Sequence, residues 1–225
     1  MLFGIENLTW SVNDLDIYVP FGAKRSLVNF FKAIGFTGSL VHCSRPYGGG
    51  SIHSIESFQC SHCKLDVVES RTHSPLSPIL EFHSTTLMNY VSVDSIFLAY
   101  LSFTGQKRLI VNPGHFTHGK LKKPTLYTLC KYRDHGFLFQ SLIQACLQDL
   151  RSSFRGHECA SAITCSETCR TSDDGGCLRA DIFVLGREED EVVNDPATIH
   201  KVSWRLGGDC CSLRLGYDNP YVQLA

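Results

Sequence analysis

The sequence predicts an α/β (α+β) protein with a mixed sheet, and three observations support that prediction. Runs in which polar and apolar residues alternate, as is typical of strands, occur near residue 15 and near residue 65. Between them lies a run with apolar residues at helical spacing. Later segments mix both patterns. We therefore expect a core in residues 1–105 and a helical and β-rich C-terminal portion, residues 106–225, packed on that core.

The first predicted strand covers residues 13–19, where acidic and apolar residues alternate until Pro20 ends the run. A helix is predicted over residues 24–34, because four apolar residues recur there at helical spacing. Gly35 follows directly and is a common helix stop. The strand and the helix would thus form the start of the core.

Residues 52–60 and 63–70 are predicted to be two strands joined by a two-residue turn. That register places Phe58 opposite Leu65, while Asp66 falls on the other, polar face of the hairpin. Three further polar residues share the face of Asp66: Ser57, Gln59 and Lys64. The hairpin would therefore have one apolar and one polar side.

The rest of the chain gives less regular signals. Helices are predicted over residues 75–83, 85–91 and 137–154. Strands are predicted over residues 107–112, 178–185, 198–206 and 211–215. Residues 94–101 are apolar and could form either. Residues 120–135 are the most basic part of the chain and contain two tyrosines, so this segment is either a solvated face or a contact for a nucleotide base.

Composition excludes some classes of function. The net charge is −1, which argues against binding nucleic acid by bulk electrostatics, so nucleic acid is not the favoured partner. No apolar stretch is long enough to span a membrane. The chain has 11 cysteines, an odd number, and no basic, apolar export signal at its start. We therefore expect reduced thiols and a cytoplasmic or nuclear location.

Three carboxylates are the main candidates for chemistry. Asp14 and Asp16 are two residues apart, so both side chains lie on one face of the first strand, and Asp66 lies on the polar face of a later strand. Like charges side by side on a strand repel each other, and a divalent cation would remove that cost. Three acids from two strands would form a cradle for Mg²⁺ and a substrate phosphate.

The order of these features resembles the catalytic core of the nucleotidyltransferase superfamily, which includes DNA polymerase beta, poly(A) polymerases and aminoglycoside nucleotidyltransferases. The shared pattern is a strand with Asp-x-Asp, a helix, a glycine-rich loop and a hairpin with one acid on its second strand, and it covers residues 4–70. Phrases such as Asn-Asp-Leu-Asp-Ile-Tyr-Val-Pro and Lys-Tyr-Arg-Asp-His-Gly-Phe are also similar to uncharacterised proteins of mushroom-forming fungi, over residues 8–185.

The resemblance implies transfer of a nucleotide from an NTP to a hydroxyl acceptor. Asp14, Asp16 and Asp66 would be the catalytic residues and would hold two Mg²⁺ ions. Asp66 could also accept the proton of the hydroxyl. Lys64 and Lys131 are candidates to bind phosphate oxygens, although a solvated lysine is the plainer interpretation of Lys64.

The chain departs from the family at the Gly-Ser pair that holds the triphosphate. Its counterpart here is Gly4-Ile5, which keeps the glycine and lacks the serine. Either the true pair lies upstream of this start, or the phosphate grip is lost with Gly4 as its remnant. A catalytically inactive binding protein of the same fold is therefore the alternative function.

A zinc-stabilised scaffold is a further alternative. Cys60-Ser-His-Cys63 has the Cys-x-x-Cys spacing of a zinc half-site. The later residues that could complete such a site are His157, Cys159, Cys165, Cys169 and Cys177. Their irregular spacing favours free structural thiols instead, and His115 and His118 have no evident third ligand. No Gly-x-Ser-x-Gly or P-loop motif supports a hydrolase or a P-loop kinase.

Overall fold

The computed structural model describes residues 14–39, 50–59, 64–93, 95–117, 120–121, 123–140, 162–182 and 202–207. These residues form an α+β structure of small sheets and few helices, which confirms the predicted class. The chain divides into two compact units, residues 1–81 with 188–202 and residues 82–187 with 203–225. Within the described ranges, no helix is both long enough and apolar enough to cross a membrane.

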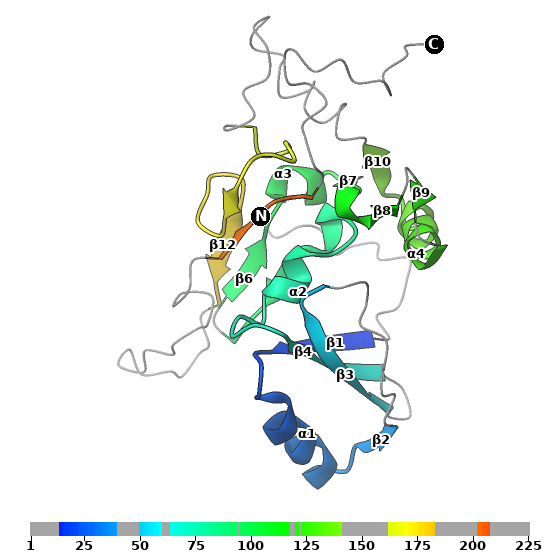
Figure 1. Ribbon diagram of the computed structural model, residues 1–225, viewed down its shortest axis with the longest axis vertical. Helices are drawn as coiled ribbons and strands as arrows, with labels where there is room; N and C mark the ends of the chain where they lie inside the picture. The colour runs from blue at the N-terminus through cyan, green and yellow to red at the C-terminus, as the bar shows by residue number, and fades with distance from the viewer. Residues whose placement is uncertain are drawn as a thin grey trace, which may run out of the picture. The chain divides into compact units, whose positions relative to one another are not determined.

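The first unit contains a four-stranded sheet with the order β1-β4-β3-β2. Figure 1 shows this sheet with helix α1 beside it. Its strands are β1 (Asp14–Val19), β2 (Thr37–Ser39), β3 (Ile52–Gln59) and β4 (Lys64–Ser70). Strand β1 runs parallel to β4, whereas β3 runs antiparallel to both β4 and β2. The sheet is therefore mixed, as predicted.

Helix α1 (Lys24–Ala33) begins without a side-chain cap from its own segment. Before the helix begins, Glu69 of β4 accepts a hydrogen bond of 3.0 Å from the backbone N–H of Gly22, which ties the turn ahead of α1 to the sheet. Glu69 is buried and also accepts a 2.6 Å hydrogen bond from the Ser54 hydroxyl. At the other end Gly35, with φ of +94°, turns the chain out of the helix.

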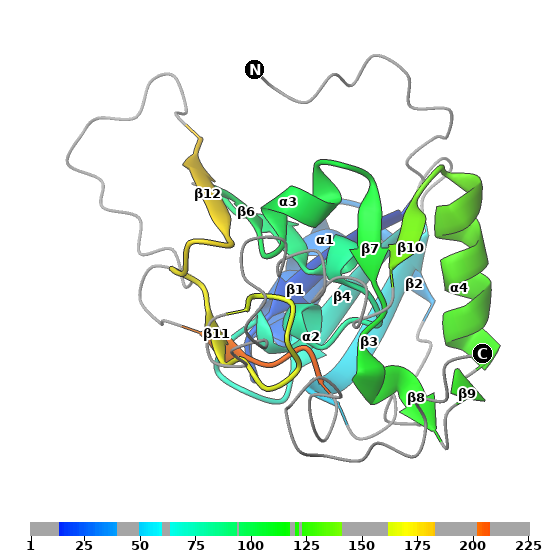
Figure 2. The same ribbon diagram turned by 90° about the horizontal axis from the view of Figure 1, so that it is seen from above.

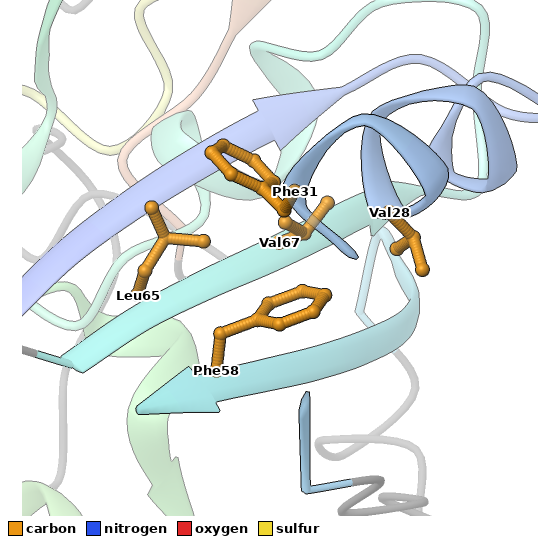
Figure 3. Packing of buried hydrophobic residues seen from close by; sticks show 5 residues of the cluster. All are labelled: Val28, Phe31, Phe58, Leu65 and Val67. Carbon is orange, nitrogen blue, oxygen red and sulfur yellow. The ribbon is translucent and has the colours of Figure 1, made fainter. Parts of the chain in front are cut away.

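The hydrophobic core of the first unit lies between α1 and one face of the sheet (Figure 3). Its buried members come from α1, β3 and β4: Val28, Phe31, Phe58, Leu65 and Val67. The rings of Phe31 and Phe58 lie 5.8 Å apart between their centres. Helix α2 (Ser77–Leu80) also belongs to this unit, and three of its four residues are buried. The opposite face of the sheet carries Asp66 together with the buried Val68.

The predicted first strand, first helix and hairpin of this unit are confirmed where the structure describes them. The strand and helix at the start of the chain are β1 and α1. The hairpin register is the predicted one, with Phe58 paired with Leu65 and Ser57 paired with Asp66. The expected turn between these strands lies outside the described residues.

The second unit is built from short elements, drawn from a second direction in Figure 2. In chain order they are η1 (Thr85–Leu87), β5 (Asn89–Val91), β6 (Ser95–Leu98), α3 (Leu101–Thr104), β7 (Arg108–Ile110), η2 (Pro113–His115), β8 (Phe116–Thr117), β9 (Lys120–Leu121), α4 (Lys123–Asp134), β10 (Leu138–Gln140), β11 (Arg170–Thr171), β12 (Leu178–Asp181) and β13 (Ser203–Trp204). Strands β12, β6 and β5 form an antiparallel sheet, and β7 pairs in parallel with β10.

A buried arginine organises the second unit. Arg170 is 1% exposed, and its guanidinium carbon lies 4.6 Å from the Tyr100 ring centre and 5.1 Å from the Trp204 ring centre. Its Nη2 donates to the backbone oxygen of Ala99 at 2.9 Å and to Oδ1 of Asp174 at 2.6 Å. Burial acts to raise the pKa of Asp174, but the hydrogen bonds and charge of Arg170 outweigh it and hold that pKa at about 2.

Several predictions for the second unit are wrong. The helix expected over residues 137–154 begins instead as strand β10, and residues 141–154 lie outside the described ranges. Gly136, with φ of +84°, ends the preceding helix, so the next residues pair with β7. The expected helix over residues 85–91 is a single 3₁₀ turn followed by β5. The basic segment 120–135 contains helix α4, which was not predicted.

Other predictions hold over shorter ranges. The expected helix at residues 75–83 is α2, with four residues. The strands expected at residues 107–112, 178–185 and 198–206 are present as β7, β12 and β13. The ambiguous segment 94–101 contains strand β6. The strand expected at residues 211–215 lies outside the described residues.

Candidate functional site

Two neighbouring parallel strands bring the predicted acids onto one face of the first sheet. In the pairing of β1 with β4, Asp14 is in register with Lys64, and Asp16 is in register with Asp66. Residues in register on neighbouring strands point to the same side, about 4.8 Å apart. We call this surface the acidic face: Asp14, Asp16 and Tyr18 of β1 with Lys64 and Asp66 of β4.

The local sequence dictates this arrangement. Alternate residues of β1 point to the other side, where Ile17 and Val19 pack against the core. On β4, Leu65 and Val67 do the same and are buried. Leu15 was expected in this apolar set, but it is 56% exposed and so lies beyond the core's edge. The predicted separation into an apolar and a polar side is incomplete, because Val68 follows Asp66 on the same side of β4 and is only 4% exposed.

Lys64 and Asp66 form an ion pair on the acidic face. The Nζ atom of Lys64 lies 2.6 Å from Oδ2 of Asp66. This hydrogen bond is the main cause that raises the pKa of Lys64, so the ammonium stays charged. The other oxygen of Asp66, Oδ1, is enclosed and has no hydrogen-bond partner among the described residues. One carboxylate oxygen is therefore paired, and the other is a buried acceptor without a described donor.

The surroundings of Asp16 disfavour the ionised form of its carboxyl group. Loss of water around it raises its pKa above the ordinary value of 3.8, and the negative charges of Asp66 and Asp14 raise it further. Lys64 partly opposes them by lowering this pKa. A proton or a cation on this face would therefore be favourable.

Tyr18 is a site residue that the sequence predictions missed. Burial raises its pKa well above the ordinary value of 10, and the nearby Asp16 adds to the shift through its charge and a hydrogen bond. The phenol thus stays protonated and donates to the Asp16 carboxylate. The signal was present in the sequence, because Tyr18 follows Asp16 by two residues and must share its strand face.

The remaining candidates for phosphate binding belong to other parts of the chain. Gly4 lies outside the described residues. Lys131 lies in α4, in the second unit, where its side chain is exposed. Lys64, in contrast, belongs to β4 and lies beside the acids within the first unit.

The zinc hypothesis can be followed only in part. Cys60, Cys63, His157, Cys159 and His118 lie outside the described residues. Three further candidates are free thiols: Cys165, Cys169 and Cys177. In the described part of the chain, no three His, Cys, Asp or Glu side chains are grouped closely enough to hold a metal ion as they stand.

The chemistry of the acidic face nevertheless fits Mg²⁺. This ion prefers oxygen ligands and is often held by one or two carboxylates together with substrate phosphates and water, so it does not need a complete cage of side chains. Asp16 of β1 and Asp66 of β4 lie side by side on adjacent strands. Oδ1 of Asp66 has no hydrogen-bond partner among the described residues. Asp14 lies two residues before Asp16 on the same strand.

Comparisons with protein families, with curated proteins and with solved structures found no match for this chain. Any function assigned to it therefore depends on the residues of the acidic face and on their chemistry.

Proposed function

We propose that this chain is a nucleotidyltransferase-like protein, in which the acidic face binds Mg²⁺ and the phosphates of an NTP and transfers the nucleotide to a hydroxyl acceptor. The observation that carries the proposal is the register of Asp16 with Asp66 on parallel neighbouring strands. Two carboxylates held side by side repel each other, and this repulsion adds to the larger effect of burial in raising the pKa of Asp16. A divalent cation with bound phosphates would relieve it.

Each residue of the face has a separate task in this proposal. Asp14, Asp16 and Asp66 would hold the ion, which when bound would acidify the acceptor hydroxyl and stabilise the leaving pyrophosphate. Asp66 would also accept the proton of the hydroxyl. Tyr18 keeps the Asp16 carboxylate in place through its hydrogen bond. Lys64 supplies a positive charge for the phosphates.

The direct test is pyrophosphate release from each of the four NTPs with Mg²⁺ and a panel of hydroxyl compounds. Asp16→Asn and Asp66→Asn should each lower turnover at least 100-fold, because each removes a charge that holds the ion. Asp134→Asn is the matched control, since that carboxylate is 67% exposed and pairs only with its neighbour Arg133 in the described structure. Turnover that is equal in all four proteins would refute the proposal.

A catalytically silent binding domain is the second candidate. The observation that favours it is the ion pair of Lys64 with Asp66, which already neutralises part of the acidic face without a metal. The sequence around Gly4 also lacks the serine of the phosphate-binding pair. This candidate predicts no pyrophosphate release and no change in melting temperature when Mg²⁺ and an NTP are added together.

A further inference from the structure

We propose that Lys64 is the resident counter-ion of the acidic face, which a divalent cation displaces from Asp66, and that the released ammonium then binds the phosphates of the nucleotide. This inference rests on the proposed function. It adds an order of binding, in which the cation binds before the nucleotide or together with it. It follows from the ion pair, from the unequal exposure of its two partners and from the charge of the face.

The ion pair places Lys64 on the atom that a metal would use. Its Nζ atom lies 2.6 Å from Oδ2 of Asp66, within the distance of a strong charged hydrogen bond. Lys64 precedes Asp66 by two residues on β4, so both side chains point to the acidic face. Lys64 is also in register with Asp14. The ammonium therefore lies among the carboxylates that would bind the cation.

The two partners differ in their access to water. The Lys64 side chain is 52% exposed, whereas the Asp66 side chain is 17% exposed. The half-exposed lysine can move its ammonium into water, and the cation that replaces it keeps the largely buried Asp66 carboxylate neutralised. Asp66 belongs to β4, which is paired with β1 on one side and with β3 on the other, so its backbone cannot move with the lysine. The exchange would therefore move Lys64 and leave the carboxylate in place.

Charge determines the direction of the exchange. When ionised, Asp14, Asp16 and Asp66 together with Lys64 leave the face with a net formal charge of −2. A divalent cation is attracted to these carboxylates twice as strongly as an ammonium at the same distance, and it repels the ammonium. It can first contact the carboxylates of Asp14 and Asp16, because both residues are exposed. The cation then takes over the role of counter-ion.

The exchange explains how the acidic face could bind a nucleotide only when a divalent cation is also bound. Without a cation, Lys64 is engaged by Asp66, and the uncompensated carboxylates repel phosphate. With a cation in place, the ammonium is free on the same face and next to the metal-bound phosphates. Phosphate binding by Lys64 would thus depend on prior occupation of the acids.

The experiment is a pair of calorimetric titrations, first with Mg²⁺ alone and then with an NTP in saturating Mg²⁺. We expect Lys64→Met to bind Mg²⁺ about 10-fold more tightly than the unmodified protein, because a competing positive charge is gone. We expect the same variant to bind the NTP about 10-fold more weakly. Lys123→Met, which removes an exposed lysine from α4, should change neither affinity.

The outcomes separate this inference from the proposed function. If Lys64→Met and the unmodified protein bind Mg²⁺ equally, the counter-ion role is overturned while the cation site stands. Weaker Mg²⁺ binding in Lys64→Met also overturns it, because Lys64 would then position Asp66 instead of competing for it. If no protein binds Mg²⁺, both proposals fail. Should Lys64→Met not fold, Lys64→Gln keeps a polar side chain there and gives the same comparison.

Discussion

Arg170 stacks on Tyr100 in the second unit, with 4.6 Å between the guanidinium carbon and the ring centre. We expect Arg170→Met to lower the free energy of unfolding by about 3 kcal/mol, because it removes this contact and leaves Asp174 without its partner. Denaturation in urea measures the change.

Arg133→Met is the matched control. Arg133 and Asp134 form an exposed ion pair, with side chains 66% and 67% exposed, so its loss should cost less than about 0.5 kcal/mol. Equal losses in the two variants would show that burial of Arg170 contributes nothing.

Replacement of Asp16 should stabilise the protein at neutral pH. Its folded-state pKa is raised above 3.8, first by loss of water and then by Asp66, so its ionised form opposes folding. Asp16→Asn should therefore raise the melting temperature at pH 7. The gain should shrink as the pH falls through the raised pKa and vanish below the ordinary value of 3.8, where the carboxyl is protonated in both states.

Thermal melts between pH 3 and pH 8 test this prediction. Asp181→Asn is a suitable control, because that side chain is 72% exposed and its substitution should leave the melting temperature nearly unchanged. A lower melting temperature for Asp16→Asn at pH 7 would contradict the raised pKa described for this carboxyl group.

His83 should make the protein sensitive to mild acid. Burial lowers its pKa from 6.5 to about 4, and repulsion from His115, whose ring lies 5.9 Å away, adds to the shift. The stability contribution of the neutral form is complete above pH 6.5 and is lost as the pH falls toward 4, because the unfolded chain takes up the proton first. We expect a loss on the order of 2 kcal/mol over this interval.

Melting curves of the unmodified protein and of His83→Gln, recorded from pH 7.5 to pH 4, isolate this contribution. The variant should lose less stability over the interval than the unmodified protein. Parallel curves would show that His83 does not titrate in this interval.

The core of the first unit should depend strongly on Phe58. This side chain is 1% exposed and contacts Phe31 from α1. We expect Phe58→Ala to cost about 3–5 kcal/mol, since it removes a large buried ring and leaves a cavity. Leu15→Ala, at a position that is 56% exposed, should cost well under about 1 kcal/mol. Chemical denaturation of both variants tests the difference, and similar costs would mean that the ring does not form part of a packed core.

The sequence predicts the first unit better than the second for a physical reason. Helix α1 has one apolar stripe, and the β3–β4 hairpin alternates clearly enough to fix Phe58 opposite Leu65. Helix α4 buries only Thr125 and Leu129 among its described residues, so its apolar stripe is too weak to be recognised. Strand β10 is the three-residue segment Leu-Phe-Gln, which is too short to show a pattern and takes its form from pairing with β7. Such pairing partners are set by tertiary structure and not by the local pattern.

The candidate site could be predicted from the sequence only in part. Strand alternation alone places Asp14 and Asp16 on one face and Asp66 on a polar face. Local sequence does not predict that β1 and β4 are neighbours, because the pairing joins segments about 50 residues apart. Nor does it predict that Lys64 pairs with Asp66, since a lysine at such a position can equally extend into water.

The pairing of β1 with β4 also has a consequence during synthesis. Strand β1 leaves the ribosome early, yet its partner emerges only after α1, β2 and β3. A nascent chain that ends before residue 64 carries Asp14 and Asp16 with no opposing strand. Strand β1 therefore cannot join the sheet until β4 has been synthesised. The pairing of β1 with β4, which brings the acids together, closes the longest loop in the sheet.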